Sequence, residues 1–297
     1  MKLFFDSRIV LFVLSFSFAS LVLAEGNSGR GIHIEVHGHR GTRGTRPENT
    51  MPAFKEGVRV GVDFLELDLH FTKDDVLVIS HDPTLPKTKC LGPDGRPLAQ
   101  DIRIRELTYA QLEKYDCGSV PQKDFPEQVL VPHTPHPAFE TLLKWVNAHA
   151  PNVGLNIETK MDEAPELLPD PKEFAQRVID MLRRYHRLDK DLLQSFDFRT
   201  LTAAKAIEPR LRRVCLTENV ADFCDVTFKE DAQFASPDFA SVTPAQVSLC
   251  HAHGIEIVPW TVDEPKDWEN QVKLGVDGII SDYPQKVIAY LKSIGRW

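Results

Sequence analysis

The segment 37–82 concentrates the residue types that perform acid–base and anion-binding chemistry in this 297-residue chain. It holds histidine clusters around His39 and His81 and, between them, the alternating acidic run E-L-D-L-H. Histidine titrates near neutral pH and therefore serves as a general acid or a general base. Arg40 offers a planar fork of donors that suits phosphate oxygens, and carboxylates bind hard cations. Together these residue types favour metal-assisted chemistry on an anionic substrate.

The carboxylates of this segment have a two-residue spacing that a β-strand would place on one face. Glu66, Asp68 and His70 alternate with leucines, and Glu158 and Lys160 repeat the spacing later in the chain. A buried carboxylate is costly unless it is paired or metal-bound. We therefore expect Glu66, Asp68 and Glu158 to bind one divalent cation, Ca²⁺ or Mg²⁺, since the ligand set has oxygen and no sulfur. The alternative is neutralisation by basic neighbours, for Glu158 a plain salt bridge to Lys160.

The candidate acid–base and phosphate-binding residues also follow predicted strands. His39 and His81 each end a strand, and we expect those two strands to be neighbours. A single histidine is more often structural, but two beside carboxylates suit a general base and a general acid. Arg40 and Lys160 would bring positive charge to a phosphoryl group, the alternative for Arg40 being a salt bridge at the rim. Trp260 would form a wall for an organic group or belong to the core.

Short apolar strands alternate with helices of about ten residues along most of the chain, a pattern typical of βαβ units around a parallel sheet. About eight such units fit, so we predict a (β/α)8 barrel formed by residues 25–297 as one domain. An open doubly wound sheet is the alternative, but no G-x-G-x-x-G turn follows the first strand. The polar residues above, with Gln194 and Asp282, fall at strand ends, where barrel enzymes have their active sites. The predicted strands cover 32–36, 64–70, 76–80, 153–157, 192–196, 211–216, 234–236, 255–261 and 278–281.

The segment of approximately 83–137 interrupts this alternation with proline- and glycine-rich turns and one short predicted helix, 107–115. A long excursion of this kind is usually a lid or a binding loop. Within it, Cys90 and Cys117 flank a loop-rich stretch and are the first pair that we expect to be bonded in an oxidising compartment. The five cysteines allow about 15 ways to form two bridges, so the sequence leaves the pairing open.

Residues 1–24 have the features of a secretory signal peptide: Lys2 and Arg8, an apolar centre, and V-L-A before Glu25. A membrane anchor is the alternative, but the 16 residues 9–24 include three serines and fall short of the roughly 20 needed to span. We expect an exported, periplasmic or secreted protein without a stable membrane span in its mature form. The net charge of −8 becomes about −9 without these residues, which carry a net +1. Acidic proteins are poor binders of nucleic acid and anionic membranes, so we expect neither as a partner.

Taken in order, the motifs H-R-G, P-E-N-T, E-L-D-L-H and S-H-D-P-T-L resemble the glycerophosphodiester phosphodiesterases. Later segments extend the resemblance over the mature chain: N-I-E-T-K at 156–160, L-L-Q-S-F at 192–196, V-P-W-T-V at 258–262 and G-I-I-S-D-Y-P at 278–284. The resemblance implies a (β/α)8 barrel with an insert after the second strand region. It also implies hydrolysis of glycerophosphodiesters, such as glycerophosphocholine or glycerophosphoethanolamine, to glycerol 3-phosphate and an alcohol with one divalent cation.

The resemblance carries roles over to the motif positions of this chain. It implies metal ligands at Glu66, Asp68 and Glu158, an acid–base pair at His39 and His81, and phosphate contacts at Arg40 and Lys160. Asn49 of P-E-N-T would shape the first loop. That loop is unusually basic and rich in threonine, so Arg43 and Arg46 would either contact phosphate or face water. The first nucleophile is left open between water and the neighbouring glycerol hydroxyl. Two other functions also stay open. One is a lysophospholipase D-like diesterase, and the other is a non-catalytic phosphodiester-binding barrel. A binding barrel of this kind would be expected to have lost a motif histidine or carboxylate.

Overall fold

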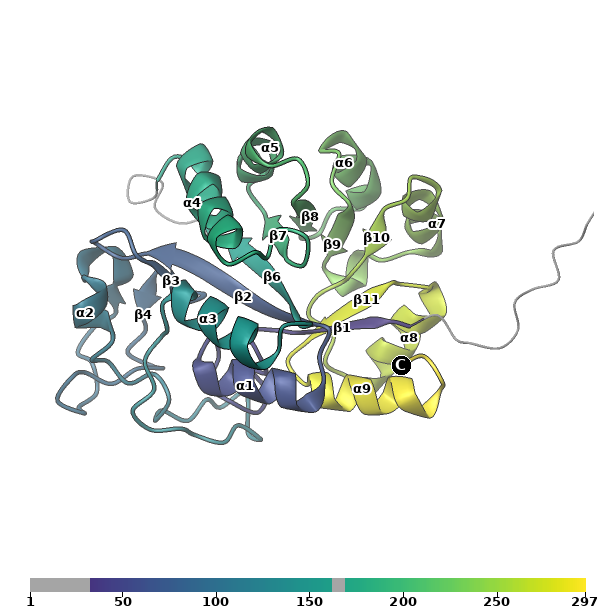
Figure 1. Cartoon of the computed structure of the whole chain (residues 1–297). Coiled ribbons are helices and arrows are strands. Elements are labelled where there is room, and N and C mark those ends of the chain that lie inside the picture. The colour runs from purple at the N-terminus through teal and green to yellow at the C-terminus, as the bar shows by residue number, and fades with distance from the viewer. Residues whose placement is uncertain (1–32, 162–168) are drawn as a thin grey trace, which may run out of the picture. The chain divides into compact units, whose positions relative to one another are not determined.

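The parallel barrel expected from the alternation is present in the computed structural model, which describes residues 33–161 and 169–297. The expected signal peptide, residues 1–24, lies outside the described residues. Strands run in the order β10-β9-β8-β7-β6-β2-β1-β11, and every neighbouring pair is parallel. In Figure 1 the strands occupy the centre and the helices surround them. The barrel strands are β1 (Glu35–Gly38), β2 (Phe64–Phe71), β6 (Gly154–Thr159), β7 (Leu192–Ser195), β8 (Arg212–Thr217), β9 (Phe234–Pro237), β10 (Glu256–Ile257) and β11 (Gly278–Ser281).

The covering helices begin and end at ordinary capping signals. The Thr50 side chain accepts a hydrogen bond from the Ala53 N–H at the start of α1, and Gly61 ends that helix with φ 94°. Proline stands in the first turn of α1, α4, α7, α8 and α9, where its missing N–H costs no helical hydrogen bond. No helix was expected from the sequence at α6 (Phe223–Lys229). The helices are α1 (Met51–Val60), α3 (Phe139–His149), α4 (Pro171–Arg184), α5 (Phe198–Ile207), α6 (Phe223–Lys229), α7 (Pro244–Ala252), α8 (Pro265–Leu274) and α9 (Pro284–Ser293).

The barrel closes between β10 and β11, where the ladder is irregular. The predicted strand 255–261 is regular only at Glu256–Ile257, because Pro259 has no N–H to donate to a ladder. Backbone hydrogen bonds nevertheless join the two segments. Asp277 N–H donates to the Ile257 carbonyl at 3.0 Å, and Ile280 N–H donates to the Pro259 carbonyl at 3.0 Å. On the other side of Trp260, Val262 N–H donates to the Ile280 carbonyl at 2.9 Å, so the chain is held against β11 both before and after Trp260.

Apolar side chains fill the space on both sides of the barrel wall. One buried cluster lies inside the barrel and consists of Phe64, Leu192, Val214, Phe234, Val258 and Ile280. A much larger cluster includes buried side chains of both strands and helices, such as Leu67 of β2 and Phe174 of α4. The sheet is therefore a packed scaffold, and its polar strand ends stand above a filled interior. Among the residues that the structure describes, no helix has both the length and the apolar character needed to cross a membrane.

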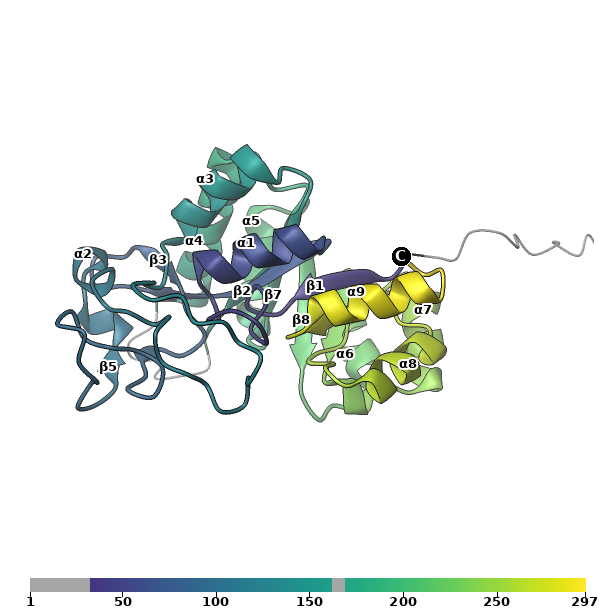
Figure 2. The same ribbon diagram turned by 90° about the horizontal axis from the view of Figure 1, so that it is seen from below.

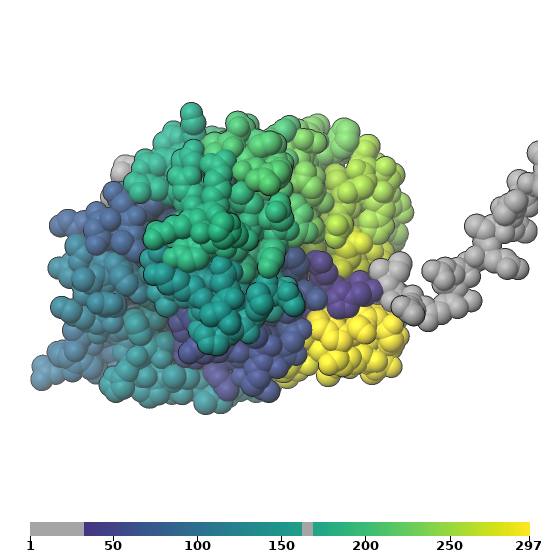
Figure 3. All heavy atoms as spheres, in the orientation of Figure 1, coloured from purple at the N-terminus to yellow at the C-terminus, as the bar shows by residue number. Residues whose placement is uncertain are grey.

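The segment 83–137 forms an irregular insert on one side of the barrel (Figure 2). It contains the short strands β4 (Thr84–Leu85) and β5 (Ile102–Arg103), a 3-10 turn at Ile104–Glu106, and α2 (Tyr109–Leu112), which is shorter than the predicted helix. In Figure 3 its blue and teal atoms gather at the flank opposite the green and yellow helices. A small core of its own includes a disulfide between Cys90 and Cys117, the pair favoured by the sequence. Cys215, Cys224 and Cys250 are buried free thiols.

Candidate active site

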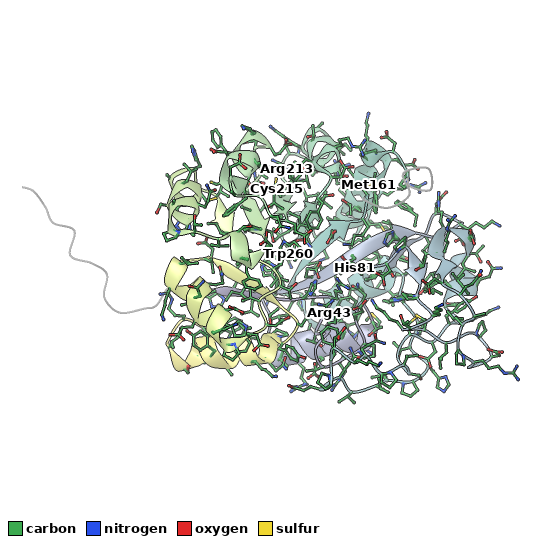
Figure 4. All side chains as sticks on the ribbon, turned by 180° about the vertical axis from the view of Figure 1, so that it is seen from behind. Arg43, His81, Met161, Arg213, Cys215 and Trp260 are labelled. Carbon is green, nitrogen blue, oxygen red and sulfur yellow. A yellow bond between two sulfur atoms is a disulfide. The ribbon has the colours of Figure 1, made fainter. Side chains whose placement is uncertain are left out.

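A cavity of about 330 Å³ opens at the carboxyl ends of the barrel strands, where the sequence placed the chemistry. Figure 4 shows Arg43, His81 and Trp260 around this central region, each contributed by a different part of the chain. The lining divides into a charged side and a largely apolar side. The charged side has His39, Arg40, Arg43, Glu66, His81, Glu158 and Lys160; the other side has Gln194, Phe196, Leu216, Glu218, Trp260, Thr261 and Ile280.

Three carboxylates come together because two neighbouring strands are in register. β2 and β6 pair in parallel with Asp68 opposite Glu158, and Glu66 lies two residues earlier on the same face. One ligand oxygen from each of Glu66, Asp68 and Glu158 lies within 4.8 Å of the others. All three side chains are at most 8 % exposed. The juxtaposition expected from the alternating spacing is therefore real.

Burial and mutual repulsion make this cluster electrostatically unfavourable on its own. Burial raises the pKa of Glu158 to about 8, although Lys160 opposes the shift. Burial and the neighbouring Asp68 and Glu158 also raise the pKa of Glu66 well above its usual range. For Asp68 burial acts in the same direction, but Lys160, His81, Arg40 and the hydrogen bond from Asn49 together lower the pKa. An all-oxygen set of three carboxylates with this repulsion fits a hard divalent cation.

Two cations border the carboxylate cluster. Lys160 Nζ lies 2.8 Å from Glu158 Oε1 and 3.4 Å from Asp68 Oδ1, so the salt bridge that was the alternative for Glu158 is present. The Arg40 N–H donates to Glu66 Oε2 at 2.8 Å, and its Nη1 lies 3.3 Å from both oxygens of Glu48. The Arg40 Nε is buried and makes no hydrogen bond with any residue that the structure describes, although it lies 3.8 Å from Asp68 Oδ2.

His39 is held by a carboxylate from the other end of the chain. Asp282 directly follows β11, and its Oδ1 lies 2.7 Å from His39 Nδ1. Because a carboxylate can only accept a hydrogen bond, His39 Nδ1 carries the proton. Its Nε2 is 3.9 Å from Glu66 Oε2. Arg43 fixes Asp282 with two bonds, from Nε at 2.9 Å and from Nη2 at 2.6 Å. Burial lowers the pKa of His39 to about 4, although Asp282 opposes the shift.

His81 reaches the same cavity by a different route from the one expected. The strand before it, β3 (Leu77–Ile79), is not a barrel neighbour of β1; it runs antiparallel to β2 beyond the barrel. The β2–β3 hairpin extends outward and returns, because the four-residue T-K-D-D turn lets the chain reverse direction. The returning chain is fixed where His70 Nε2 donates to the His81 carbonyl at 3.0 Å. The His81 Nδ1 lies 2.9 Å from Oδ1 of Asp82.

Trp260 combines the two alternatives that the sequence left open. Its indole Nε1 donates to the Ser236 carbonyl at 3.0 Å, and the ring packs against the apolar cluster inside the barrel. The same ring lines the cavity and meets Phe196 edge to face, with centroids 5.6 Å apart. An aromatic corner thus faces the charged side of the cavity.

Residues 39–286 match the Glycerophosphoryl diester phosphodiesterase family. The chain belongs to this family. It is 29% identical over 261 residues to the Glycerophosphodiester phosphodiesterase of Caldanaerobacter subterraneus subsp. tengcongensis, covering 88% of this chain and 98% of that one.

Solved structures agree on the fold of this phosphodiesterase family member. A structure from Silicibacter pomeroyi DSS-3, assigned to the glycerophosphoryl diester phosphodiesterases, has a TM-score of 0.83 and 28% identity over 90% of this chain and 96% of that one. A phosphodiesterase from Oleispira antarctica, solved with the product sn-glycerol-3-phosphate, has a TM-score of 0.72 at 23% identity, covering 87% and 96%. The (β/α)8 barrel predicted from the sequence is confirmed.

The structure of this family member brings all eight predicted site residues together.

It also shows hydrogen-bond partners of these residues that the sequence had not assigned. From the sequence Asp282 is only a strand end, and its bond to His39 spans 243 residues. Gln194 donates to Glu66 Oε1 and Asn49 donates to Asp68 Oδ2, both at 2.8 Å, so Asn49 orients a carboxylate besides shaping the loop. Arg43 faces Asp282 and the cavity. The Arg46 Nη1 donates to the Thr45 carbonyl at 2.8 Å instead.

Proposed function

We infer that the chain hydrolyses glycerophosphodiesters, such as glycerophosphocholine or glycerophosphoethanolamine, to glycerol 3-phosphate and an alcohol. One observation carries this conclusion. Two imidazoles, each with Nδ1 on a carboxylate, border one cavity together with the cations Arg40, Arg43 and Lys160. Glu66 and Glu158 also line this cavity, and they cluster with Asp68. The family to which the chain belongs supports the same reaction. The chain is accordingly a phosphoric diester hydrolase.

Glu66, Asp68 and Glu158 would hold one divalent cation, Ca²⁺ or Mg²⁺. When bound, such an ion neutralises charge that develops on the non-bridging phosphoryl oxygens. The donor set supports a hard cation, since all its members are carboxylates and none is a thiolate. The side-chain amides of Gln194 and Asn49 hold two of the three carboxylates in place from behind.

The two histidines would divide the proton transfers. His39 acts as the general base, because Asp282 occupies its Nδ1–H and burial keeps its Nε2 unprotonated. His81 acts as the general acid and protonates the leaving alkoxide through its Nε2. The Arg40 guanidinium and the Lys160 ammonium stabilise the anionic phosphoryl group between them. The nucleophile that His39 deprotonates is either water or the neighbouring glycerol hydroxyl. If the glycerol hydroxyl attacks, a cyclic phosphate forms first.

The apolar side of the cavity would contact an organic part of the substrate. Trp260 and Phe196 form its aromatic corner, with Leu216 and Ile280 beside them. A cavity of about 330 Å³ suits a small deacylated diester. A lysophospholipid would require further space for its acyl chain, and substrate comparison separates the two cases.

We also propose that the mature protein is exported, periplasmic or secreted, with residues 1–24 removed. The charge and hydropathy pattern of these residues supports a signal peptide. The disulfide between Cys90 and Cys117 supports an oxidising compartment, because such bonds are rare in a reducing cytosol.

A substrate panel tests the reaction class. The purified mature chain is given glycerophosphocholine, glycerophosphoethanolamine or lysophosphatidylcholine with Ca²⁺ or Mg²⁺, and the phosphate products are identified by mass spectrometry. Glycerol 3-phosphate from the first two substrates is expected, and its loss in His39→Ala would assign the activity to this site. Faster release of lysophosphatidate would instead indicate a lysophospholipase D. No turnover of any substrate would support a binding barrel.

A further inference from the structure

Lys89 belongs to the insert and has no role in the reaction proposed above. Its ammonium group nevertheless contacts two carboxylates of the site. Its Nζ lies 3.0 Å from Asp82 Oδ2 and 2.8 Å from Glu48 Oε1. Asp82 is the carboxylate partner of His81, and Glu48 is the carboxylate partner of Arg40. One lysine therefore connects the proposed general acid with a proposed phosphate contact.

The Asp82 side of this connection fixes the orientation of an imidazole. Oδ1 of Asp82 accepts from His81 Nδ1 at 2.9 Å, while Oδ2 accepts from Lys89 Nζ. Because each oxygen has its own donor, the carboxylate plane cannot turn without breaking one of two charge-assisted bonds. With Nδ1 occupied, His81 keeps Nε2 for the cavity that it lines.

On the Glu48 side, Lys89 stabilises a partly buried carboxylate next to Arg40. Glu48 receives Lys89 Nζ on Oε1, and Arg40 Nη1 lies 3.3 Å from each of its oxygens. Burial opposes the charge on Glu48, but Arg40 and Lys89 together lower its pKa to about 2. Burial opposes the charge on Asp82 too, but His81 and Lys89 lower its pKa, so both carboxylates that receive the Lys89 ammonium remain charged at neutral pH.

The disulfide of the insert holds the backbone that carries Lys89. The next residue, Cys90, is buried and bonded to Cys117, and its N–H donates to the Pro86 carbonyl at 2.9 Å. Leu91 and Asp116 exchange two backbone hydrogen bonds, of 2.7 and 3.1 Å, beside the disulfide. A fixed backbone reduces the conformational entropy that the long lysine side chain loses when it is ordered.

We propose that Lys89 is a positioning residue, which holds Asp82 so that His81 presents Nε2 to the leaving-group oxygen. This inference rests on the proposed function, in which His81 protonates an alkoxide. The test therefore compares two leaving groups. The choline alkoxide requires a proton, whereas 4-nitrophenolate departs without one, so only the first reaction depends on a well-oriented acid.

The variant is Lys89→Met, and its matched control is Lys87→Met, an exposed lysine in the same loop. On glycerophosphocholine, Lys89→Met should lower kcat by about 10-fold or more and change KM by less than about 2-fold. On the 4-nitrophenyl ester of glycerol 3-phosphate the loss should be less than about 2-fold. In an Asp82→Asn background, adding Lys89→Met should cost less than about 2-fold, because the two residues act through one contact. Lys87→Met should match the wild type on both substrates.

Three results would overturn the inference while the wild type remains active. One is an unchanged kcat on glycerophosphocholine, and another is an equal loss of kcat with both leaving groups. The third is a rise in KM alone on both substrates, which would mean that Lys89 acts through Glu48 and Arg40. A wild type that releases no glycerol 3-phosphate refutes the proposed function, and the inference fails with it.

Discussion

Each imidazole of the site has one ring nitrogen bonded to a carboxylate, but the two surroundings differ. His39 is deeply placed, and Asp282 is itself clamped by Arg43. His81 is nearer to solvent, with 30 % of its side chain exposed. This asymmetry suits a base that must stay unprotonated and an acid that must exchange protons with water.

At the residue scale, Asp282→Asn should impair the base without unfolding the protein. An asparagine NH₂ donates where the carboxylate accepted, so the His39 tautomer that leaves Nε2 free is no longer favoured. We expect kcat on glycerophosphocholine to fall by about 10² to 10⁴. Steady-state kinetics and circular dichroism would check this. Asp189→Asn, at an exposed aspartate, serves as the control. Wild-type turnover in Asp282→Asn would mean that Asp282 does not orient the base.

Titration of the site makes stability depend on pH when no metal is present. The folded state keeps a proton on Glu158 up to about pH 8, whereas the unfolded chain loses it near 4.5. Folding lowers the pKa of His39 instead, so His39 makes stability rise with pH, but only between about pH 4 and pH 6.5. Above about pH 6.5 the folded state therefore binds more protons than the unfolded state, so stability falls as pH rises towards 8.

Thermal unfolding of the chelated protein between pH 6.5 and 8 measures this dependence. The unfolding temperature should decline with pH, more steeply than in Glu158→Gln, which has no proton to lose at that position. Saturating divalent cation should reduce the decline, since it binds the deprotonated carboxylates. A chelated wild type whose stability rises with pH over this range would contradict the raised pKa of Glu158.

Much of the site follows from local sequence, and the rest depends on contacts that no local pattern encodes. The alternation of Glu66 and Asp68 with leucines was enough to place both carboxylates on one face. The bond between His39 and Asp282 depends instead on β1 and β11 being neighbours, which closure of the barrel decides. The motif also identified His81, but not its position on an antiparallel hairpin.

Helices and strands with a regular pattern of apolar residues were predictable from the sequence. Elements whose bounds depend on one residue, or whose residues favour another structure, were not. β11 has the bounds expected from its sequence. β10 is shorter than expected because Pro259 cannot donate to the ladder. Helix α6 was missed because its sequence, F-C-D-V-T-F-K, has β-branched and aromatic residues in place of strong helix formers.

The insert is an element held together mainly by its disulfide and a few buried side chains. Cys90 and Cys117 are 27 residues apart in sequence, and closing a loop of that length stabilises the folded state by about 3.5 kcal/mol in the chain-entropy treatment. The double variant Cys90→Ser, Cys117→Ser should lower the free energy of unfolding by about 2–4 kcal/mol. Denaturant titration followed by circular dichroism measures it, with Cys215→Ser as a control at a buried free thiol. An unchanged midpoint in the double variant would show that the bond does not stabilise the insert.

At the scale of the whole molecule, the barrel assembles one site from distant parts of the chain. The proposed base directly follows β1, and its carboxylate partner directly follows β11. The three clustered carboxylates lie on β2 and β6, and the second imidazole follows β3 of the β2–β3 hairpin. The insert then covers the first loop, where Val129 N–H donates to the Thr45 carbonyl at 2.9 Å. The proposed reaction depends on the three carboxylates holding a cation.

The most direct test is glycerol 3-phosphate release from glycerophosphocholine by the mature protein after chelation, and again after Ca²⁺ or Mg²⁺ is restored. Activity should vanish with chelator and return with at least one of the two ions. Glu66→Gln should remain at least about 100-fold slower with the ion present, while its circular dichroism spectrum matches the wild type. Full activity in chelator, or near-normal turnover by Glu66→Gln, would contradict the account.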